Sequence, residues 1–180
     1  MEKEVNGLKN QKSNTQTKLK CVLGFSDEET LKLDFDNVSF RTAKYWCQRA
    51  CRQFHLEGFI ILKSSPNHYH AVFNKPMLSW DDNMKYVAWI CLWTKYRRLT
   101  EWLIMQLIKK CSTLRISPKG NKPMPRVVYK YGRQDKKIKE FLDFRNKIKR
   151  IYRNLLKLQS NTTKDMFVET IKNHECYVQT

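Results

Sequence analysis

Hydrophobic and polar positions follow two different periods in the first half of the chain. Over residues 31–36 apolar and charged side chains alternate, which predicts a strand with one apolar face. Over residues 39–56 apolar side chains recur at helical spacing, which predicts an amphipathic helix capped by Ser39. An apolar run predicts a buried strand over residues 58–65, and a Ser-Ser-Pro-Asn turn leads into a returning strand over residues 68–74. The predicted order is therefore strand, helix, strand, strand.

The second half of the chain predicts three helices and two more strands. Residues 79–110 are rich in Trp, Ile, Leu and Met, and this segment is long for one helix, so we expect two helices that meet near residues 95–98. Residues 111–117 and 126–131 are predicted strands on either side of a loop that contains Gly and Pro. Residues 134–158 predict a long amphipathic helix.

The order of these elements predicts an α+β fold. Strand, helix, strand and strand make up half of a βαββαβ unit, so we expect a ferredoxin- or RRM-like antiparallel sheet with flanking helices and a basic C-terminal helix. A length of 180 residues suits one domain with tails. The expected parts are a flexible N-terminal arm (1–19), a core (20–132) that opens with a short strand, the basic C-terminal helix (133–158) and a weakly ordered tail (159–180).

The charge of the chain indicates a polyanionic partner. The sequence has 35 Lys and Arg against 17 Asp and Glu, a formal charge of +18. Such a surface is typical of proteins that bind nucleic acid, and an acidic membrane surface is the second candidate. Within residues 130–157 we count 11 Lys or Arg against 3 Asp or Glu. In the C-terminal helix we expect the nucleic-acid backbone to contact Lys137, Arg145, Lys149 and Arg150.

The spacing of the cysteines and the hydropathy of the chain indicate a cellular compartment. None of the six cysteines forms a C-x-x-C pair, so the sequence does not predict a structural zinc site, and we expect reduced thiols. Residues 1–20 are polar and Lys-rich, unlike a signal peptide. No apolar run reaches the ~20 residues that a membrane-spanning helix needs. We therefore expect a cytoplasmic protein without a membrane partner, in the host cell if the source is viral.

Two acidic side chains are the clearest candidates for a functional site. Asp34 and Asp36 are two residues apart on a predicted strand, so their side chains share one face. Neighbouring carboxylates repel each other, and a divalent cation is a natural way to relieve that repulsion. A strand that carries His70 follows in the same predicted sheet. The sequence therefore predicts a cation site on this face.

At these residues the chain resembles the archaeo-eukaryotic primase superfamily, especially the small primase-polymerases of archaeal plasmids and viruses. Asp34 and Asp36 match the family's D-x-[DE] strand. Ser65 and His70 occupy the Ser and His places of its strand–turn–strand motif, although the family's turn is usually Gly-rich and this one is not. The order and spacing of the two motifs are more specific than either motif alone.

A third motif resembles the same family further along the chain. Residues 114–122 are similar to the family's L-R-h-P-G-x-x-N-x-K strand and loop, in which basic residues face the triphosphate. Arg115 and Lys122 are the positions that match. The resemblance therefore extends over about residues 30–130, most of the chain that we expect to be ordered.

The resemblance implies a primase-like catalytic core over residues 20–132 that joins nucleotides by two-metal transfer. It implies that Asp34 and Asp36 bind Mg²⁺ or Mn²⁺ and act in catalysis together with His70. It also implies four residues that hold the nucleotide: Ser65, His70, Arg115 and Lys122. The implied partners are a single-stranded DNA template, nucleoside triphosphates and a replicative helicase, in the replication of a mobile element.

One departure from the family concerns the third metal-binding acid. The family carries that acid just before its third motif, whereas residues 108–112 of this chain contain none. Glu101, Asp81 or Asp82 could supply it from elsewhere. A missing ligand would weaken the second metal site, so a nucleic-acid-binding relative without catalysis stays an alternative.

A second alternative uses the histidines. Residues 68–73 resemble the His-hydrophobic-His motif of the HUH-type rolling-circle replication initiators and relaxases, and His68 and His70 share a strand face as a metal pair requires. In that family a Tyr attacks the scissile phosphate and leaves a protein–DNA bond. Tyr86 lacks the Lys four residues later that the family pattern requires, and Tyr129 lies in a predicted strand, as does Tyr131. This alternative also gives the two aspartates no role.

Overall fold

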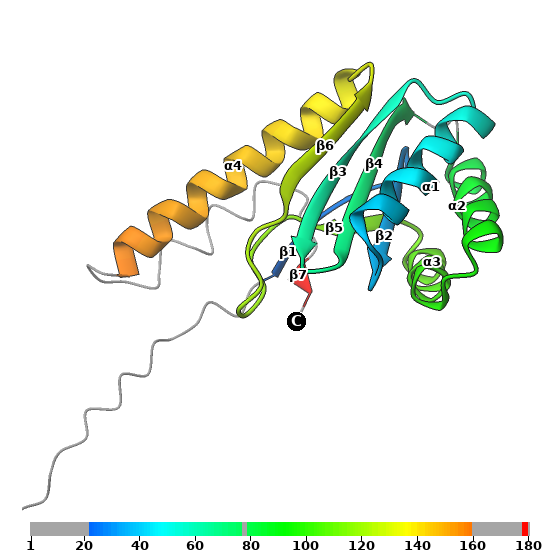
Figure 1. Ribbon diagram of the computed structural model, residues 1–180. Coiled ribbons are helices and arrows are strands. Elements are labelled where there is room, and N and C mark those ends of the chain that lie inside the picture. The colour runs from blue at the N-terminus through cyan, green and yellow to red at the C-terminus, as the bar shows by residue number, and fades with distance from the viewer. Residues whose placement is uncertain (1–21, 77–78, 160–177, 180) are drawn as a thin grey trace, which may run out of the picture.

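The computed structural model describes residues 22–76, 79–159 and 178–179, which form four helices and two antiparallel sheets (Figure 1). The predicted α+β class is confirmed. The predicted arm (1–19) lies outside the described residues, and the predicted tail (159–180) is described only at residue 159 and in a short strand. In chain order the elements are β1 (Val22–Asp27), β2 (Thr30–Asp36), α1 (Phe40–Gln53), β3 (Gly58–Ser65), β4 (His68–Pro76), α2 (Trp80–Thr94), α3 (Arg97–Lys109), β5 (Ser112–Arg115), β6 (Arg126–Gly132), α4 (Lys136–Gln159) and β7 (Val178–Gln179).

The larger sheet has the strand order β2-β4-β3-β6, and each strand is antiparallel to its neighbour. Its first three strands and α1 form the βαββ half of a ferredoxin-like fold, in which the third strand lies between the first two. β6 joins the sheet beside β3, so β2 is an edge strand. The smaller sheet has the order β5-β1-β7, and β5 packs against β2.

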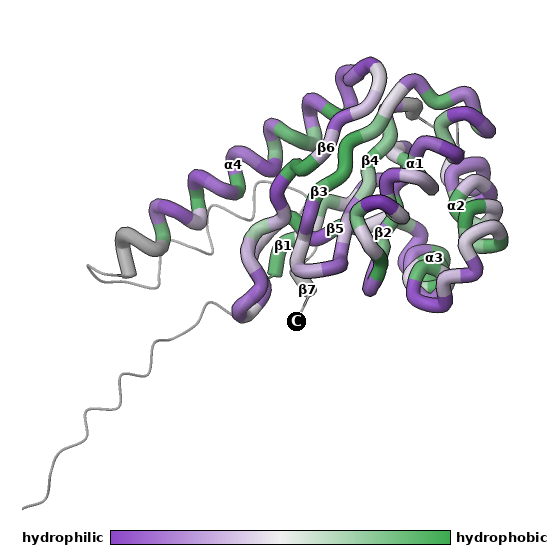
Figure 2. The backbone as a smooth tube through the Cα atoms, viewed as in Figure 1, coloured by the Kyte–Doolittle hydropathy of each residue, from purple (hydrophilic) through white to green (hydrophobic). Residues whose placement is uncertain are grey.

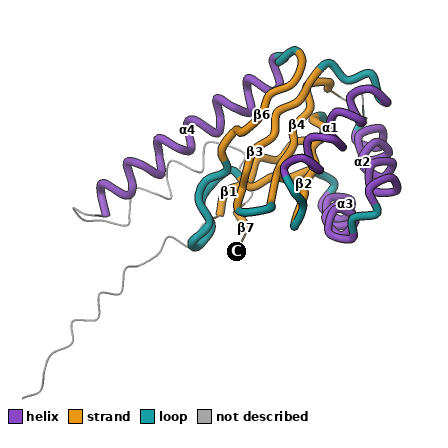
Figure 3. The backbone as a smooth tube through the Cα atoms, viewed as in Figure 1, coloured by secondary structure: helices purple, strands orange, loops and turns teal. Residues whose placement is uncertain are grey.

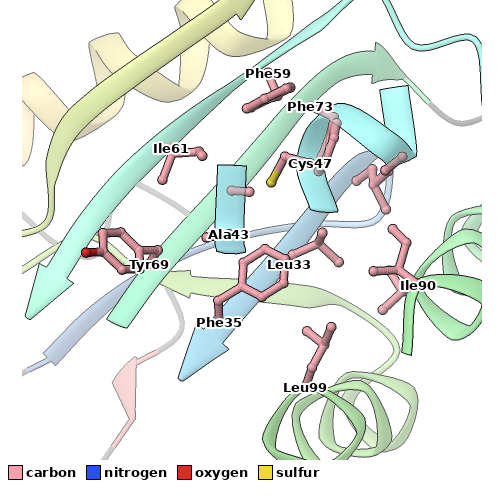
Figure 4. Packing of buried hydrophobic residues seen from close by; sticks show 14 of the residues in the cluster. Leu33, Phe35, Ala43, Cys47, Phe59, Ile61, Tyr69, Phe73, Ile90 and Leu99 are labelled. Carbon is pink, nitrogen blue, oxygen red and sulfur yellow. The ribbon is translucent and has the colours of Figure 1, made fainter. Parts of the chain in front are cut away.

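One face of the larger sheet carries the main apolar core, which α1, α2 and α3 cover (Figure 4). Alternation along β2 places Leu33 and Phe35 on this face, and neither is more than 1% exposed. Their neighbours come from all three helices and from the other strands: Ala43, Cys47, Ile90, Leu99, Phe59, Ile61, Tyr69 and Phe73. Burial of each large apolar side chain here contributes roughly 1.5–3 kcal/mol.

The opposite face of the larger sheet packs against the smaller sheet and α4. Ile60 and Val72 from the larger sheet meet Leu114 of β5 and Phe141 of α4 in a second apolar cluster. Polar and apolar residues alternate along α4 at helical spacing, as Figure 2 shows. Although α4 has 24 residues, neither it nor another helix in the described part of the chain is long and apolar enough to cross a membrane.

A charged residue lies between the two sheets. Lys32 on β2 is fully buried, and its Nζ lies 2.8 Å from Asp27 Oδ1. The same Nζ donates to the backbone oxygen and the Oγ of Ser112, at 3.2 and 3.0 Å. Burial lowers the pKa of Lys32 to about 8, although Asp27 acts in the opposite direction. We call Lys32, Asp27 and Ser112 the buried lysine cluster, and it joins β2 to strands β1 and β5 of the smaller sheet.

The helix boundaries follow from local sequence signals. Ser39 caps α1 as predicted, because its Oγ accepts a hydrogen bond from the Thr42 amide at 3.1 Å. Ser79 caps α2 by accepting from the Asp82 amide, also at 3.1 Å. Lys95 adopts a left-handed conformation (φ 54°) and ends α2 inside the region where the sequence predicted a break.

Candidate functional site

A pocket of about 400 Å³ opens where the polar ends of β2 and β4 meet α3 and the smaller sheet. The end of β3 and the loop between β5 and β6 also contribute to its wall, and Figure 3 shows this loop and the β3–β4 turn at the same end of the sheet. Every residue predicted for catalysis, metal binding or nucleotide binding lines this pocket: Asp34, Asp36, Ser65, His70, Arg115 and Lys122. The fold therefore brings the three sequence motifs together in one place.

The register between β2 and β4 creates two acid–histidine pairs. Asp34 lies opposite His70, and Asp36 lies opposite His68. His68 Nδ1 is 2.5 Å from Asp36 Oδ1, which makes a short hydrogen bond. His70 Nε2 is 3.6 Å from Asp34 Oδ1, which is too long for one. Because strand side chains alternate, all four lie on the same face of the sheet.

Asp34 and His70 are polar groups without full hydrogen bonding. Asp34 Oδ1 and His70 Nδ1 are both buried and have no hydrogen-bond partner. Burial, and then the charge of Asp36, raise the pKa of Asp34 to about 7, while Arg115 and Lys122 act in the opposite direction. Burial and then Arg115 lower the pKa of His70 to about 3. At neutral pH His70 is therefore uncharged, and Asp34 keeps its proton to a much higher pH than a free carboxyl does.

Arg115 connects two parts of the pocket wall. Its guanidinium donates to the backbone oxygen of Ser64 at 2.9 Å and to that of Pro123 at 3.0 Å. It thus joins the end of β3 to the loop that follows β5, and it is neither fully exposed nor fully buried. The positive charge of the side chain acts to lower the pKa of Asp34, against the effect of burial.

Two lysines lie on a tight turn at the pocket. The amide of Lys119 donates to the Lys122 oxygen at 3.0 Å, and the Lys122 amide donates back at 2.9 Å. Gly120 between them has φ +55°, a conformation that favours glycine. Both lysines are exposed and line the pocket, so the turn presents two ammonium groups as a pair.

The third acid is the weakest part of the predicted metal site. Of the three acids considered from the sequence, Glu101 lines the pocket, where it accepts hydrogen bonds from Arg97 at 2.7 Å and Arg98 at 2.9 Å. Asp82 instead belongs to the cap of α2, and Asp81 is exposed on that helix. As the side chains lie, no three His, Cys, Asp or Glu residues in the described ranges are placed to hold a metal ion.

Two further residues belong to the site. His68, which the sequence linked only to the alternative initiator function, lines the pocket beside Asp36. Its spacing of two from His70 was the available signal, because that spacing puts both rings on one face. Lys119 was missed, and its place across a Gly-containing turn from Lys122 was the signal.

Some basic side chains of the C-terminal helix α4 are exposed, and others contact another part of the protein. Lys149 and Arg150 are exposed on α4, as a nucleic-acid surface requires. Lys137 forms an ion pair with Glu29 in the β1–β2 turn, which raises the pKa of Lys137. These three residues remain compatible with contacts to a nucleic-acid backbone.

Arg145 requires a correction to the predicted nucleic-acid surface. Its side chain is only 8% exposed, and its Nε donates to the Pro125 backbone oxygen at 2.7 Å. A second nitrogen of the same guanidinium, Nη2, donates to that oxygen as well. Arg145 therefore holds the loop before β6 against α4, and its guanidinium does not lie on an exposed face.

No model of a known protein family matches the chain, and no curated protein or solved structure matches it either. A function for the chain therefore has to be inferred from the residues and the geometry of the pocket.

Proposed function

We propose that the protein is a primase-polymerase-like nucleotidyltransferase that primes or extends strands on a single-stranded DNA template. The observation that carries this proposal is the convergence of Asp34 and Asp36 with a basic wall in one pocket. Two carboxylates opposite several cations are what transfer of a metal-bound nucleoside triphosphate requires. The resemblance of the three motifs to primases supports the same activity.

Asp34 and Asp36 would hold the divalent cation, Mg²⁺ or Mn²⁺. The buried, unpartnered Oδ1 of Asp34 fits this role, because a cation would satisfy that oxygen and relieve its repulsion from Asp36. When bound, such ions align the reacting oxygens and neutralise the charge that develops on them. The geometry thus supports a site that is complete only with a cation.

The basic side chains would hold the triphosphate. Lys119 and Lys122 offer two ammonium groups at the pocket, and Arg115 adds a positive charge deeper in the wall. His70 is uncharged at neutral pH, so it would donate one N–H to a phosphate oxygen without adding charge. Ser65 lies in the same wall and offers a hydroxyl. The template would follow the exposed basic side of α4.

The initiator-type nuclease remains the second candidate, because both histidines of its motif lie in the pocket. Its nucleophile is the difficulty. None of the seven tyrosines within the described ranges lines the pocket, and Tyr177 lies outside those ranges. Tyr69 points to the opposite, apolar core. The two aspartates also have a role only in nucleotidyl transfer.

The test is a primer-extension and priming assay with single-stranded template, NTPs or dNTPs, and Mn²⁺ or Mg²⁺. We expect template-dependent product from the wild type and a loss of at least ~100-fold in Asp34→Asn, because a direct ligand matters at least as much as the residues that support it. Asp81→Asn is the matched control, since this exposed acid lies outside the pocket.

Two other outcomes would replace the proposal. A covalent tyrosyl–DNA adduct without nucleotide incorporation would establish the nuclease instead. Metal-independent duplex binding that survives the double change Asp34→Ala and Asp36→Ala, again without incorporation, would establish a non-catalytic binding protein.

A further inference from the structure

We propose that His68 is a direct metal ligand of the Asp34/Asp36 site and takes the place of the missing third acid. The site would then bind a first-row transition ion in preference to Mg²⁺. This inference rests on the proposed function in one respect, because it assumes that a cation binds at Asp34 and Asp36.

The position of His68 follows from strand register. Asp36 and His68 are direct cross-strand partners, and His68 Nδ1 lies 2.5 Å from Asp36 Oδ1. Two metal–ligand bonds of about 2.1 Å at right angles would separate the ligating atoms by about 3 Å. The pair therefore needs to open by only about 0.5 Å for a cation to replace the proton that the two atoms share. A small rotation of an imidazole that is 30% exposed is enough.

The neighbouring pair provides an independent indication of a ligand. The His70 side chain is 5% exposed, and its Nδ1 has no hydrogen-bond partner. The Oδ1 atom of Asp34 on the facing strand is also buried and also has no partner. Buried polar atoms without partners are uncommon in folded proteins and need an explanation. Both atoms belong to residues that line the same pocket as His68, so a bound cation and its water ligands would satisfy them.

The competing third ligand is Glu101. Its carboxylate is already held by Arg97 and Arg98, both on its own helix, and no hydrogen bond connects it with Asp34 or Asp36 in the described structure. Hydrogen bonds from these arginines lower the pKa of Glu101. His68, in contrast, already touches a carboxylate of the site. The geometry therefore favours His68.

An imidazole ligand has consequences for the choice of metal. Mg²⁺ takes oxygen ligands in a nearly ideal octahedron, whereas imidazole nitrogen suits transition ions. Two carboxylates and one imidazole form a mixed set that would bind Mn²⁺ more tightly than Mg²⁺, and Co²⁺ more tightly again. The histidine would thus both replace the missing acid and change the metal preference.

The experiment uses Mn²⁺ bound to the full chain, because pulsed electron paramagnetic resonance detects a nitrogen atom bonded directly to this ion. His68→Asn keeps an N–H donor near the position of Nδ1 but removes the imidazole. His55→Asn is the matched control, because His55 is exposed and has the left-handed backbone (φ 52°) that Asn adopts readily. We expect nitrogen coupling in the wild type and in His55→Asn, and none in His68→Asn.

Affinities provide the second measurement. We expect His68→Asn to weaken Mn²⁺ binding by ~10-fold or more, and His68→Asp to reduce the ratio of Mn²⁺ to Mg²⁺ affinity, because it restores an all-oxygen set. Should His68→Asn fail to fold by circular dichroism, the wild-type spectrum and the His68→Asp affinities decide the matter.

The failures of the two proposals are distinguishable. If Mn²⁺ binds in a manner that requires Asp34 but shows no nitrogen coupling, or if the coupling survives in His68→Asn, the role of His68 is disproved and the nucleotidyltransferase proposal stands. If wild-type Mn²⁺ binding is absent or is unchanged in Asp34→Asn, the metal site of the proposed function fails, and the role of His68 fails with it.

Discussion

Lys32 and Asp34 are two residues apart on the same face of β2, but their surroundings differ. Lys32 is fully buried and has an ion-pair partner in Asp27 and two hydrogen bonds to Ser112. Asp34 retains a quarter of its side-chain exposure, and its Oδ1 has no partner. Burial shifts the pKa of both groups toward the neutral form. A shifted pKa therefore does not distinguish the surroundings of these two groups, whereas the presence or absence of a partner does.

The basic side chains of α4 also differ in whether a partner within the protein holds them. Arg145 donates from two nitrogens to one backbone oxygen and is buried, whereas Arg150 is exposed five residues later. A count of basic residues treats the two as equal. Their environments indicate that the first holds the fold together and the second is available to a phosphate backbone.

The largest expected effect comes from breaking the buried lysine cluster. Asp27→Asn should lower the free energy of unfolding by ~3 kcal/mol, because it leaves Lys32 buried without a counter-charge. The amide oxygen can still accept the hydrogen bond that the Thr30 amide makes at 2.7 Å, so the turn keeps its contact. Urea denaturation at neutral pH measures the change.

Lys32→Met is the control for that experiment. It removes the buried charge and retains most of the volume, so it should cost about 1 kcal/mol or less. Burial lowers the pKa of Lys32 from 10.5 to about 8, so between these values the unfolded chain holds a proton that the folded chain has lost. Wild-type stability relative to Lys32→Met should therefore rise over this interval. A severe loss in Lys32→Met with none in Asp27→Asn would show that packing, and not charge, holds the cluster.

The second prediction concerns Asp34, the buried carboxyl group without a partner. Burial and Asp36 raise the pKa of Asp34 from 3.8 to about 7, so between these values the folded protein holds a proton that the unfolded chain has released. The wild type loses stability as pH rises through this interval, and Asp34→Asn does not. A rise of this size corresponds to at most ~4 kcal/mol, and the partial exposure of Asp34 reduces our expectation to about 2 kcal/mol.

Thermal or urea unfolding of both proteins across the acidic range checks this prediction. The two curves should coincide below pH ~4 and separate fully above pH ~7. A saturating divalent cation should close the gap at high pH, because it stabilises the ionised wild-type site alone. Equal stability at every pH would mean that Asp34 is well solvated and that its unpartnered oxygen carries no cost.

The third prediction separates the two kinds of arginine on α4. Arg145→Gln should lower stability by ~1–3 kcal/mol, because it leaves the Pro125 oxygen without its donors. The double change Lys149→Gln and Arg150→Gln should leave stability within ~0.5 kcal/mol, but should reduce the salt dependence of nucleic-acid binding by about two charges. Urea denaturation and binding titrations at several salt concentrations make the comparison. The reverse pattern would place the nucleic-acid surface elsewhere.

Much of this structure could be predicted from local patterns. The alternation in β2 and the helical period of α1 fixed which side chains enter the main core, and the three motifs identified six residues of the pocket. The pairing of β2 with β4 could not be predicted in the same way, because α1 and β3 separate these strands in the chain and no turn sets their register. For that reason the contact between His68 and Asp36 emerged only from the structure.

One wrong prediction and one feature that was not predicted have physical causes. The burial of Lys32, on the polar face of β2, could not be predicted, because it depends on the smaller sheet that packs against this face. Arg145 could have been placed correctly, because it follows Phe141 by four residues and precedes Ile148 by three, on the buried stripe of α4. Its charge was given more weight than its position. Strand β7 has two residues, too few to show a period.

The smallest expected effect concerns Lys137, whose ion pair with Glu29 is half-buried at Lys137 and exposed at Glu29. Such pairs contribute ~0–1 kcal/mol, so Glu29→Gln should change stability by less than ~0.5 kcal/mol. It would, however, remove the counter-charge that competes with a phosphate for Lys137. We therefore expect Glu29→Gln to strengthen nucleic-acid binding slightly at low salt, and Lys137→Gln to weaken it. In the Lys137→Gln background Glu29→Gln should have less effect, and equal effects in both backgrounds would show that Lys137 does not contact the nucleic acid.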